Sequence, residues 1–211
     1  MFAFALLALL SPLAQAAPPG WEVIRNAEGV EVARKTVEGS PLFAFRGEGV
    51  VEAHISKVYA TVVDNGRSHQ WVDMLQPVAT LQGAGTDDRV VYQHYDLPWP
   101  VDDRDYVLRM RTQLDEGAKV ATVQFGSTTV ASKPDQDCCV RGEVVRTFWK
   151  LEALPGGKTK VTIEVQTDPK GSLPAAIVNL VQKDWPYNTV TGLRRQVAAG
   201  VAGAEDRLAG W

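Results

Sequence analysis

Histidines are the side chains in this chain best suited to acid–base chemistry near neutral pH. There are three, His54, His69 and His94. None stands at a recognisable spacing from a nucleophile or a carboxylate, and the three do not have the spacing of a zinc triad. An enzyme would need a general acid or base inside a substrate cavity. The residues therefore favour a protein that is not an enzyme and that uses no metal or cofactor, with an enzyme as the alternative.

The two cysteines, Cys138 and Cys139, are adjacent in a polar segment. Cα atoms across a trans peptide lie about 3.8 Å apart, below the roughly 4.4–6.8 Å usual for a disulfide, so a bond between them would be strained and easily reduced. Their spacing is not that of a known metal motif. Three possibilities stay open: no functional role, redox sensing, or pairing with another molecule.

A third kind of chemistry is the recognition of a polar group inside an apolar lining. Gln93, Tyr95, Tyr106 and Thr147 each stand among apolar residues on one side of a predicted strand. A buried polar side chain needs a hydrogen-bond partner, and a ligand head group can be that partner. We expect these four residues to orient a head group or hydroxyl. A neighbouring side chain or a buried water is the alternative partner.

The strands that would position these residues follow from alternation of apolar and polar side chains. One face is apolar and the other polar, which is typical of antiparallel strands with one wetted face. Gly47 and Gly49 fall on the apolar face and predict close approach by another element or a bend. The predicted strands cover 21–26, 29–36, 42–52, 89–97, 104–112 and the runs around 121–125, 145–151 and 161–165, and their apolar face carries Phe43, Phe45, Val91, Leu108, Met110, Phe125, Val145 and Trp149.

Helical spacing appears in two places. Residues 54–64 predict one helix, and 68–74, which contains Trp71, a second short one. Ser172 as N-cap and Pro174 just inside begin a long amphipathic C-terminal helix, which Pro186 should kink or break. The simplest packing is one antiparallel sheet curving over this helix, an α+β fold. The helix carries Ile177, Val178, Leu180, Val181 and Trp185, and the stripe continues through Leu193, Val197, Val201 and Leu208.

Composition and the N-terminus bound the remaining possibilities. A chain of 211 residues, 45% hydrophobic, is long enough for one domain with a sizeable core. A formal charge of −3 argues against a nucleic-acid partner. Residues 1–16 predict a signal peptide cleaved after Ala16, although they contain no Lys or Arg, so the true start of the chain could lie upstream. We expect a monomer of residues 17–211 in the periplasm or secreted, with a membrane anchor or a buried N-terminal helix as alternatives.

Two sequence blocks resemble the START family, the lipid-transfer domains related to the steroidogenic acute regulatory protein. They are the proline-flanked block from Leu97 to Val107, which contains Pro-Trp-Pro and Asp-Arg-Asp-Tyr, and the block from Thr167 to Pro174. They stand in the family's order and at about its spacing, and the resemblance extends over about 21–197. It implies a helix-grip fold with an internal hydrophobic cavity, and a bacterial secreted or periplasmic member that binds lipid, contacts membranes transiently and carries its ligand between them.

The resemblance also implies where the ligand would lie. Trp99, Leu173, Ile177 and Leu180 would form the gate. The guanidinium chemistry of Arg104 itself favours a clamp on the neighbouring turn, with contact to the ligand as the alternative. Gln70 and Val72 flank Trp71, where relatives that grip phospholipid heads carry an Arg and an Asp, so a sterol-like or fatty acyl ligand is favoured over a phospholipid. A polyketide cyclase or hydratase, and a lipid sensor that does not transfer its ligand, remain alternatives. The expected lining is Phe43, Phe45, Trp71, Val91, Gln93, Tyr95, Tyr106, Leu108, Met110, Phe125, Thr147, Trp149, Ile177 and Val181.

Overall fold

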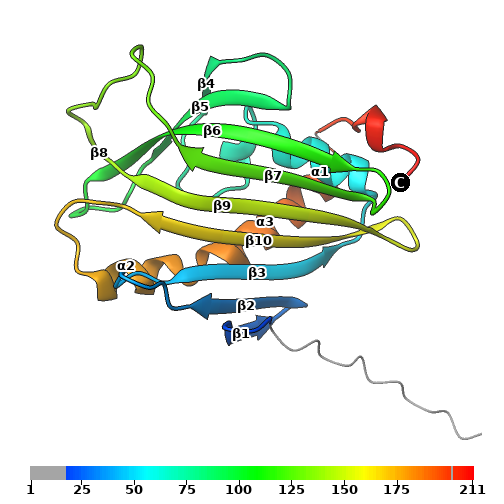
Figure 1. Ribbon diagram of the computed structural model, residues 1–211, viewed down its shortest axis with the longest axis horizontal. Coiled ribbons are helices and arrows are strands. Elements are labelled where there is room, and N and C mark those ends of the chain that lie inside the picture. Colours follow the sequence, from blue (N-terminus) through cyan, green and yellow to red (C-terminus); the bar gives the residue numbers. More distant parts are fainter. Residues whose placement is uncertain (1–17, 201) are drawn as a thin grey trace, which may run out of the picture.

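The computed structural model describes residues 18–200 and 202–211, so the predicted signal peptide and Val201 lie outside it. Ten strands form one curved sheet, with β8 beside β6 and the other strands in the order β1-β2-β3-β10-β9-β7-β6-β5-β4 (Figure 1). The strands are β1 (Glu22–Ala27), β2 (Val30–Lys35), β3 (Ala44–Val51), β4 (Ala79–Gln82), β5 (Asp88–Tyr95), β6 (Asp103–Asp115), β7 (Val120–Ser127), β8 (Cys139–Arg141), β9 (Glu143–Leu154) and β10 (Lys158–Asp168).

Neighbouring strands pair antiparallel, as the alternation predicts, with one exception. The short strand β8 runs parallel to the start of β6, with Asp103 opposite Cys139 and Asp105 opposite Arg141. The sequence offered no sign of β4 or β8, because strands of three or four residues carry too little alternation to be recognised.

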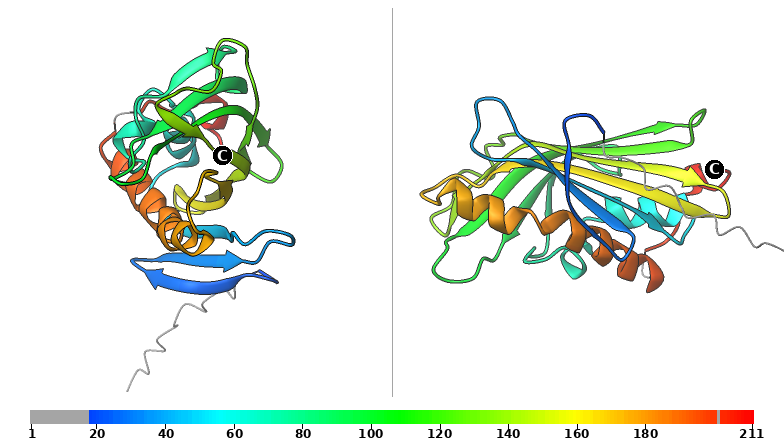
Figure 2. Two further views of the ribbon diagram at one scale, coloured as in Figure 1. Left: turned by 90° about the vertical axis from the view of Figure 1, so that its left-hand side faces the viewer. Right: turned by 90° about the horizontal axis from the view of Figure 1, so that it is seen from below.

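The helices lie against the concave face of the sheet and close its open side (Figure 2). They are α1 (Ile55–Val63), α2 (Ala175–Gln182) and α3 (Trp185–Ala198), with 3₁₀ turns η1 (Ser68–Gln70) and η2 (Asp206–Leu208). The break predicted at Pro186 is confirmed, since α2 ends at Gln182 and α3 begins at Trp185 with the proline in its first turn. Among the described residues, no helix has the length and apolar composition to cross a bilayer.

Three helical predictions differ from the structure in detail. The second short helix is only the three-residue turn η1. Pro174, not Ser172, caps α2, because its extended backbone (ψ 136°) delays the helix to Ala175. Leu208 does not continue the helix α3 but lies in the separate turn η2, where it is fully buried against the core.

The main core fills one end of the concave face, where α1 and α3 pack on the sheet. We call this end the packed half. Its side chains, such as Leu151 and Ile163 from the sheet and Val58 and Leu193 from the helices, are fully buried in one cluster. At the other end the sheet faces α2 and the loop between β5 and β6 (Figure 1). We call this end the pocket half.

Candidate functional site

A pocket of about 380 Å³ lies in the pocket half, between the sheet and the helices α2 and α3. The sheet supplies its walls from the end of β5, the start of β6, the end of β7, the start of β9 and the end of β10. The segment from η1 to Leu75 and the β5–β6 loop complete it. Most of the lining is apolar, and the described lining residues include Trp71, Val72, Leu75, Leu97, Leu108, Phe125, Val144, Trp149, Val165, Ile177, Val178 and Val181.

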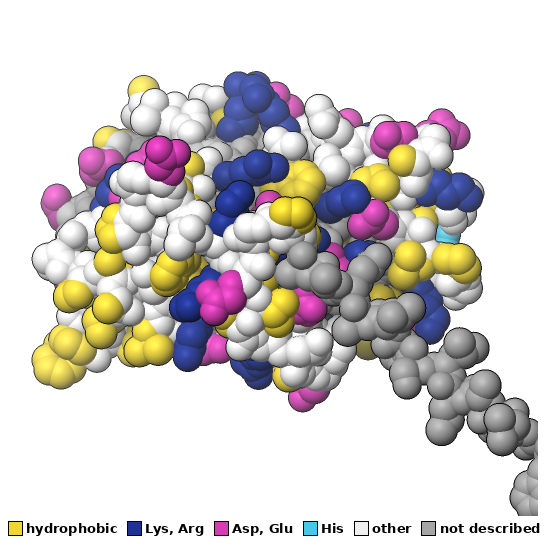
Figure 3. Space-filling model, turned by 60° about the horizontal axis from the view of Figure 1, so that its bottom comes forward, with side chains coloured by type: hydrophobic (Ala, Val, Ile, Leu, Met, Phe, Trp, Pro, Cys, Tyr) yellow, Lys and Arg dark blue, Asp and Glu magenta, His cyan; other side chains and the backbone are white. Residues whose placement is uncertain are grey.

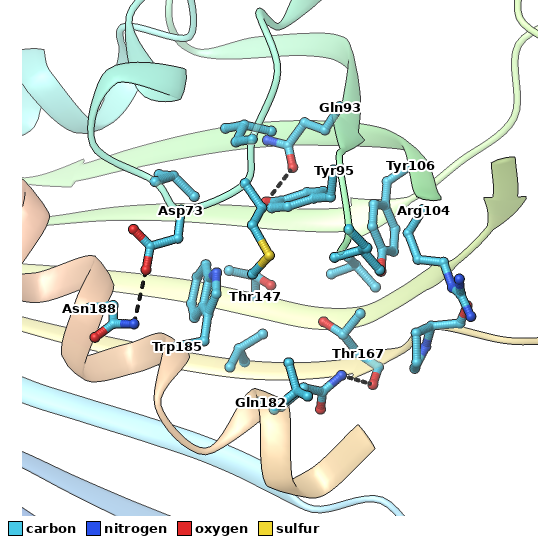
Figure 4. Close-up of a pocket in the computed structure, with 18 of the residues that line it drawn as sticks. Asp73, Gln93, Tyr95, Arg104, Tyr106, Thr147, Thr167, Gln182, Trp185 and Asn188 are labelled. Atoms are coloured by element: carbon cyan, nitrogen blue, oxygen red, sulfur yellow. Dashed lines mark hydrogen bonds between the residues drawn. The ribbon is translucent and has the colours of Figure 1, made fainter. Parts of the chain in front are cut away.

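The polar side chains of the pocket are mostly neutral. The Tyr95 hydroxyl donates to Oε1 of Gln93 at 3.3 Å, and the Tyr95 ring meets the Tyr106 ring edge to face (Figure 4). Burial raises the pKa of both phenols well above its ordinary value. Both tyrosines therefore stay protonated at neutral pH and offer hydrogen bonds without charge.

On the helical side, two hydrogen bonds hold the pocket closed. Nε2 of Gln182 donates to the carbonyl of Thr167 at 3.2 Å, which ties the end of α2 to β10. Nδ2 of Asn188 donates to Oδ2 of Asp73 at 2.9 Å, which ties α3 to the segment after η1 (Figure 4). Both bonds cross from a helix to the opposite wall, so they must be broken or stretched if the helices move away.

Arg104 lies at the rim and joins the two sequence blocks that carry the family resemblance. It is 3% exposed. Each of its three nitrogens donates to a backbone carbonyl: Nε to Pro169 at 2.9 Å, Nη2 to Lys170 at 3.3 Å and Nη1 to Asp102. These bonds hold the two turns, as expected, and Arg104 also lies among the described residues that line the pocket.

Two carboxylates anchor the base of the β5–β6 loop. Asp103 accepts the backbone N–H of Leu97 at 2.9 Å and Nε2 of His94 at 2.7 Å, and these bonds, the first above all, lower the pKa of its carboxyl. Asp105 is fully buried and forms a two-bond pair with Arg141, each bond 2.8 Å long. Burial alone would raise the pKa of Asp105, but the bonds from Arg141 outweigh it and leave the pKa below its ordinary value.

Exposed hydrophobic side chains gather beside the pocket. Trp99, on the β5–β6 loop, is 92% exposed, and Ile177, Leu180 and Val181 on α2 are about half exposed. Figure 3 shows hydrophobic side chains clustered at this end of the face that carries the helices. We call these four residues the apolar rim. Such a surface is unusual for side chains without a partner or membrane to cover them.

Most of the residues expected to line a cavity do surround the pocket. Among the expected gate residues, Leu173 and Ile177 also line it, whereas Trp99 stays outside in solvent. The residues of the expected set that line the pocket are Trp71, Gln93, Tyr95, Tyr106, Leu108, Phe125, Thr147, Trp149, Ile177 and Val181.

Four expected lining residues and the expected gate residue Leu180 do not line the pocket, for two reasons. Val91 and Met110 are on the correct face but fully covered, Val91 in a cluster with Leu108 and Met110 in the main core. Phe43, Phe45 and Leu180 line a separate groove between β1–β3 and the outer side of α2. Alternation identifies the face of a strand, but it does not show which part of that face another element covers.

The sequence also missed lining residues. In β9, Val145 was expected inside, but it is 53% exposed and Val144 is buried instead. The cause is a bulge: Gln166 of β10 pairs with Arg146 and Thr167 with Val144, so Val145 is the extra residue. Val165 followed the alternation of its strand and Trp185 the apolar stripe of its helix, so both could have been included, whereas Asn65 follows the end of α1, where no periodic signal exists.

The three histidines do not assemble into one site. Nε2 of His54 lies 2.9 Å from the carbonyl of Trp211, and its Nδ1 accepts from the backbone N–H of Ser56 at the start of α1. Nδ1 of His69 is buried without a hydrogen-bond partner among the described residues. His94 lies on the outer side of β5, beside Asp103. No histidine is among the described residues that line the pocket.

Comparison with known proteins places these features in a family. The chain matches the model of the START domain over residues 2–199. It is 30% identical over 175 residues to an uncharacterised protein of Pseudomonas aeruginosa, covering 82% of this chain and 85% of that one. It is 26% identical over 167 residues to the phosphatidylcholine transfer protein of Bos taurus, covering 78% of each.

Solved structures agree with this match. The crystal structure of a STAR-related lipid transfer protein fragment from Xanthomonas axonopodis superposes with a TM-score of 0.75 and 28% identity, covering 85% of this chain and 99% of that one. The family match includes the predicted signal peptide, so it does not separate a leader from the domain.

Proposed function

Because the chain belongs to the START domain family, we propose that it binds one hydrophobic amphiphile in the pocket and carries it between membranes. The observation that supports this proposal most directly is the pocket itself: a mostly apolar space beneath the C-terminal helices, with the neutral polar groups of Gln93, Tyr95 and Tyr106 on its sheet wall. A lining of this kind is typical of sites that bury most of a small ligand.

The size and charge of the pocket favour a sterol-like or single-chain acyl ligand. Its volume of about 380 Å³ lies in the lower part of the roughly 300–1,000 Å³ range of ligand pockets. The guanidinium of Arg104 is already bonded to backbone carbonyls. Gln93, Tyr95 and Tyr106 suit a hydroxyl, ketone or ester better than a charged head group.

Exchange of such a ligand needs a membrane. A chain of about 16 methylenes, at roughly 0.8 kcal/mol each, would lose on the order of 13 kcal/mol on moving unaided into water. Release directly into a bilayer avoids this loss. The apolar rim would touch the bilayer, and α2 would separate from the β5–β6 loop when the Gln182–Thr167 bond opens. We further propose that the protein works as a monomer in the periplasm or outside the cell, after cleavage following Ala16.

The cyclase or hydratase alternative has less support. A general base must be unprotonated near neutral pH. Among the described lining residues there is no histidine, and the raised pKa of Tyr95 and Tyr106 keeps both phenols protonated. The carboxylate in the lining, Asp73, already accepts a hydrogen bond from Asn188.

Two measurements test the proposal. Mass spectrometry of lipid extracted from the natively purified protein should identify one amphiphile per chain. Transfer of a fluorescent sterol or fatty acid between vesicles should then be accelerated by the protein and slowed at least about tenfold in Trp99→Ala, with equilibrium binding unchanged. Val23→Ala, which removes an exposed apolar side chain on β1 that is not part of the rim, is the matched control.

Each failure has a distinct meaning. Binding without accelerated transfer would identify a sensor. Transfer by Trp99→Ala at the wild-type rate would contradict the role of the rim. No binding of any amphiphile would contradict the proposed function altogether.

A further inference from the structure

A cluster of metal-ligating side chains lies outside the pocket, on the outer face of the sheet. It consists of His94 from β5, Asp103 from β6 and Cys139 from β8, and one ligand atom of each lies within 4.8 Å of the others. The cluster exists because β8 pairs parallel to the start of β6, which sets Cys139 directly opposite Asp103. β5 pairs with β6 on its other side and brings in His94. Nothing in lipid binding requires these three side chains to meet.

The distances suit a tetrahedral ion. Zn²⁺ bonds of about 2.3 Å to sulfur and about 2.0 Å to nitrogen place the two ligand atoms roughly 3.6 Å apart. Sγ of Cys139 lies 3.7 Å from Nε2 of His94. Oδ2 of Asp103 is 2.7 Å from the same nitrogen. The carboxylate would need to move outward by roughly 0.7 Å, so that oxygen and nitrogen are separated as two ligands of one tetrahedral Zn²⁺ are.

The carboxylate is also held from behind. Oδ1 of Asp103 accepts the backbone N–H of Leu97 at 2.9 Å, which leaves Oδ2 directed at His94 and Cys139. Hydrogen bonds of this kind orient the ligands of metal sites. The neighbouring position along β6 and β8 holds the Asp105–Arg141 pair, which fixes the two strands relative to each other.

In the structure, Cys139 is joined to Cys138 in a disulfide. A disulfide sulfur is not a thiolate and does not bind Zn²⁺ as one. Cys138 is exposed, so a dithiol can reach the bond. Thiol–disulfide exchange between this dithiol and the Cys138–Cys139 bond would give two protein thiols and the disulfide of the reductant, a balanced two-electron transfer. Zn²⁺ would then displace the proton of the Cys139 thiol.

We propose that this cluster is a redox-controlled site for Zn²⁺ or a similar borderline divalent ion, which binds to Cys139, His94 and Asp103 only when the Cys138–Cys139 disulfide is reduced. The fourth position would hold water or the Cys138 thiolate. The proposal is independent of lipid transfer, since it concerns the outer face of the sheet. A bound ion would connect β5, β6 and β8 at the base of the β5–β6 loop.

Co²⁺ is the probe that tests the site, because cobalt bound by a thiolate in a tetrahedral site absorbs characteristically. The mature chain is reduced with a phosphine, freed of reductant and titrated with Co²⁺ and then Zn²⁺. We expect the reduced protein to bind one Co²⁺ per chain with a thiolate charge-transfer band, and Zn²⁺ to displace the cobalt. The oxidised protein should bind no Co²⁺ at this site. Cys138→Ser should bind Co²⁺ without any reductant, because Cys139 is then always a thiol.

Variants decide which atoms bind. His94→Ala and Cys139→Ser should weaken binding more than about 100-fold, beyond the roughly 10–100-fold typical of an outer-shell change. His69→Ala, which alters a histidine outside the cluster, should leave binding unchanged. Thermal unfolding without metal checks that each variant is folded. Tight binding that needs both cysteines but not His94 would overturn the proposal in favour of a simple dithiol adduct, and so would the absence of binding to folded, reduced protein.

Discussion

The packed half and the pocket half lie on the same face of the same strands, yet they have opposite properties. In the packed half, Leu151, Val161 and Ile163 are fully buried against α1 and α3. Further along the same two strands, Thr147 and Val165 line the pocket. The strands continue without interruption from one half to the other, so the difference arises from what covers them.

The covering elements differ in how they are held. α3 packs on the sheet through fully buried residues such as Val190 and Leu193. α2 has only one buried residue, Val178, and depends on polar ties. Asn179 accepts from the N–H of Phe43 at 2.9 Å and donates to the carbonyl of Pro41 at 3.0 Å. The comparison indicates that stability resides in one half and adaptability in the other.

The largest predicted effect concerns the buried ion pair Asp105–Arg141, which joins β6 to β8 beside the pocket half. Arg141→Ala leaves the buried Asp105 without its charged partner, so we expect a loss of about 3–5 kcal/mol in the free energy of unfolding. Arg109 also lies on β6, and it forms an exposed pair with Asp88 of β5. Arg109→Ala should cost less than about 1 kcal/mol. Urea unfolding measures both. Similar losses in the two variants would show that the Asp105–Arg141 pair contributes no more than a surface pair.

A leucine from each half gives the direct comparison. Leu193→Ala, in the packed half, removes a fully buried side chain and should cost about 2–5 kcal/mol. Leu173→Ala, at the pocket, removes a side chain that already borders open space, so we expect less than about 1.5 kcal/mol. Thermal and urea unfolding of the ligand-free protein measure the difference. Equal costs would mean that the pocket half is as well packed as the rest.

Substitutions that enlarge a side chain should show the same contrast between the two halves. Ala121→Leu inserts atoms into the packed half, where Ala121 is fully buried, and should cost about 1–3 kcal/mol. Thr147→Leu inserts similar bulk into the pocket and should change stability by less than about 1 kcal/mol. The same variant should bind less lipid. A strongly destabilised Thr147→Leu with normal lipid content would contradict the location of the binding space.

The smallest effect is a dependence on pH. The pKa of Asp105 is lowered in the folded state, so its contribution is complete above the unfolded pKa of about 3.9 and is lost as pH falls below that value. We expect Asp105→Asn, although less stable at neutral pH, to lose less stability than the wild type between about pH 5 and pH 3. Urea midpoints across that range give the two slopes. Parallel slopes would show that Asp105 does not titrate with a lowered pKa.

Much of the fold could be predicted because its signals are local. Alternation located the long strands, and Pro186 located the break between α2 and α3. The two conspicuous blocks around Arg104 and Lys170 indicated the family, and the structure shows that one side chain joins them.

The site was predicted less completely because it depends on non-local packing. Met110 and Phe45 alternate as pocket residues would, yet Met110 is enclosed in the main core and Phe45 lines the groove on the outer side of α2. The bulge at Val145 exchanged the inner and outer side chains of β9 without any mark in the sequence. The meeting of His94, Asp103 and Cys139 depends on the parallel pairing of a three-residue strand, which no periodicity indicates.

Gly47 confirms the close approach expected from the sequence, since a Cβ atom placed there would lie 2.8 Å from Cβ of Pro186. The corner between the two C-terminal helices thus rests on bare backbone. That corner joins α3, which is packed on the sheet, to the shorter helix α2, which lies half exposed beside the pocket. We expect Gly47→Ala to push this corner away from the sheet and to move α2 away from the pocket, although Gly47 is not among the residues that line it.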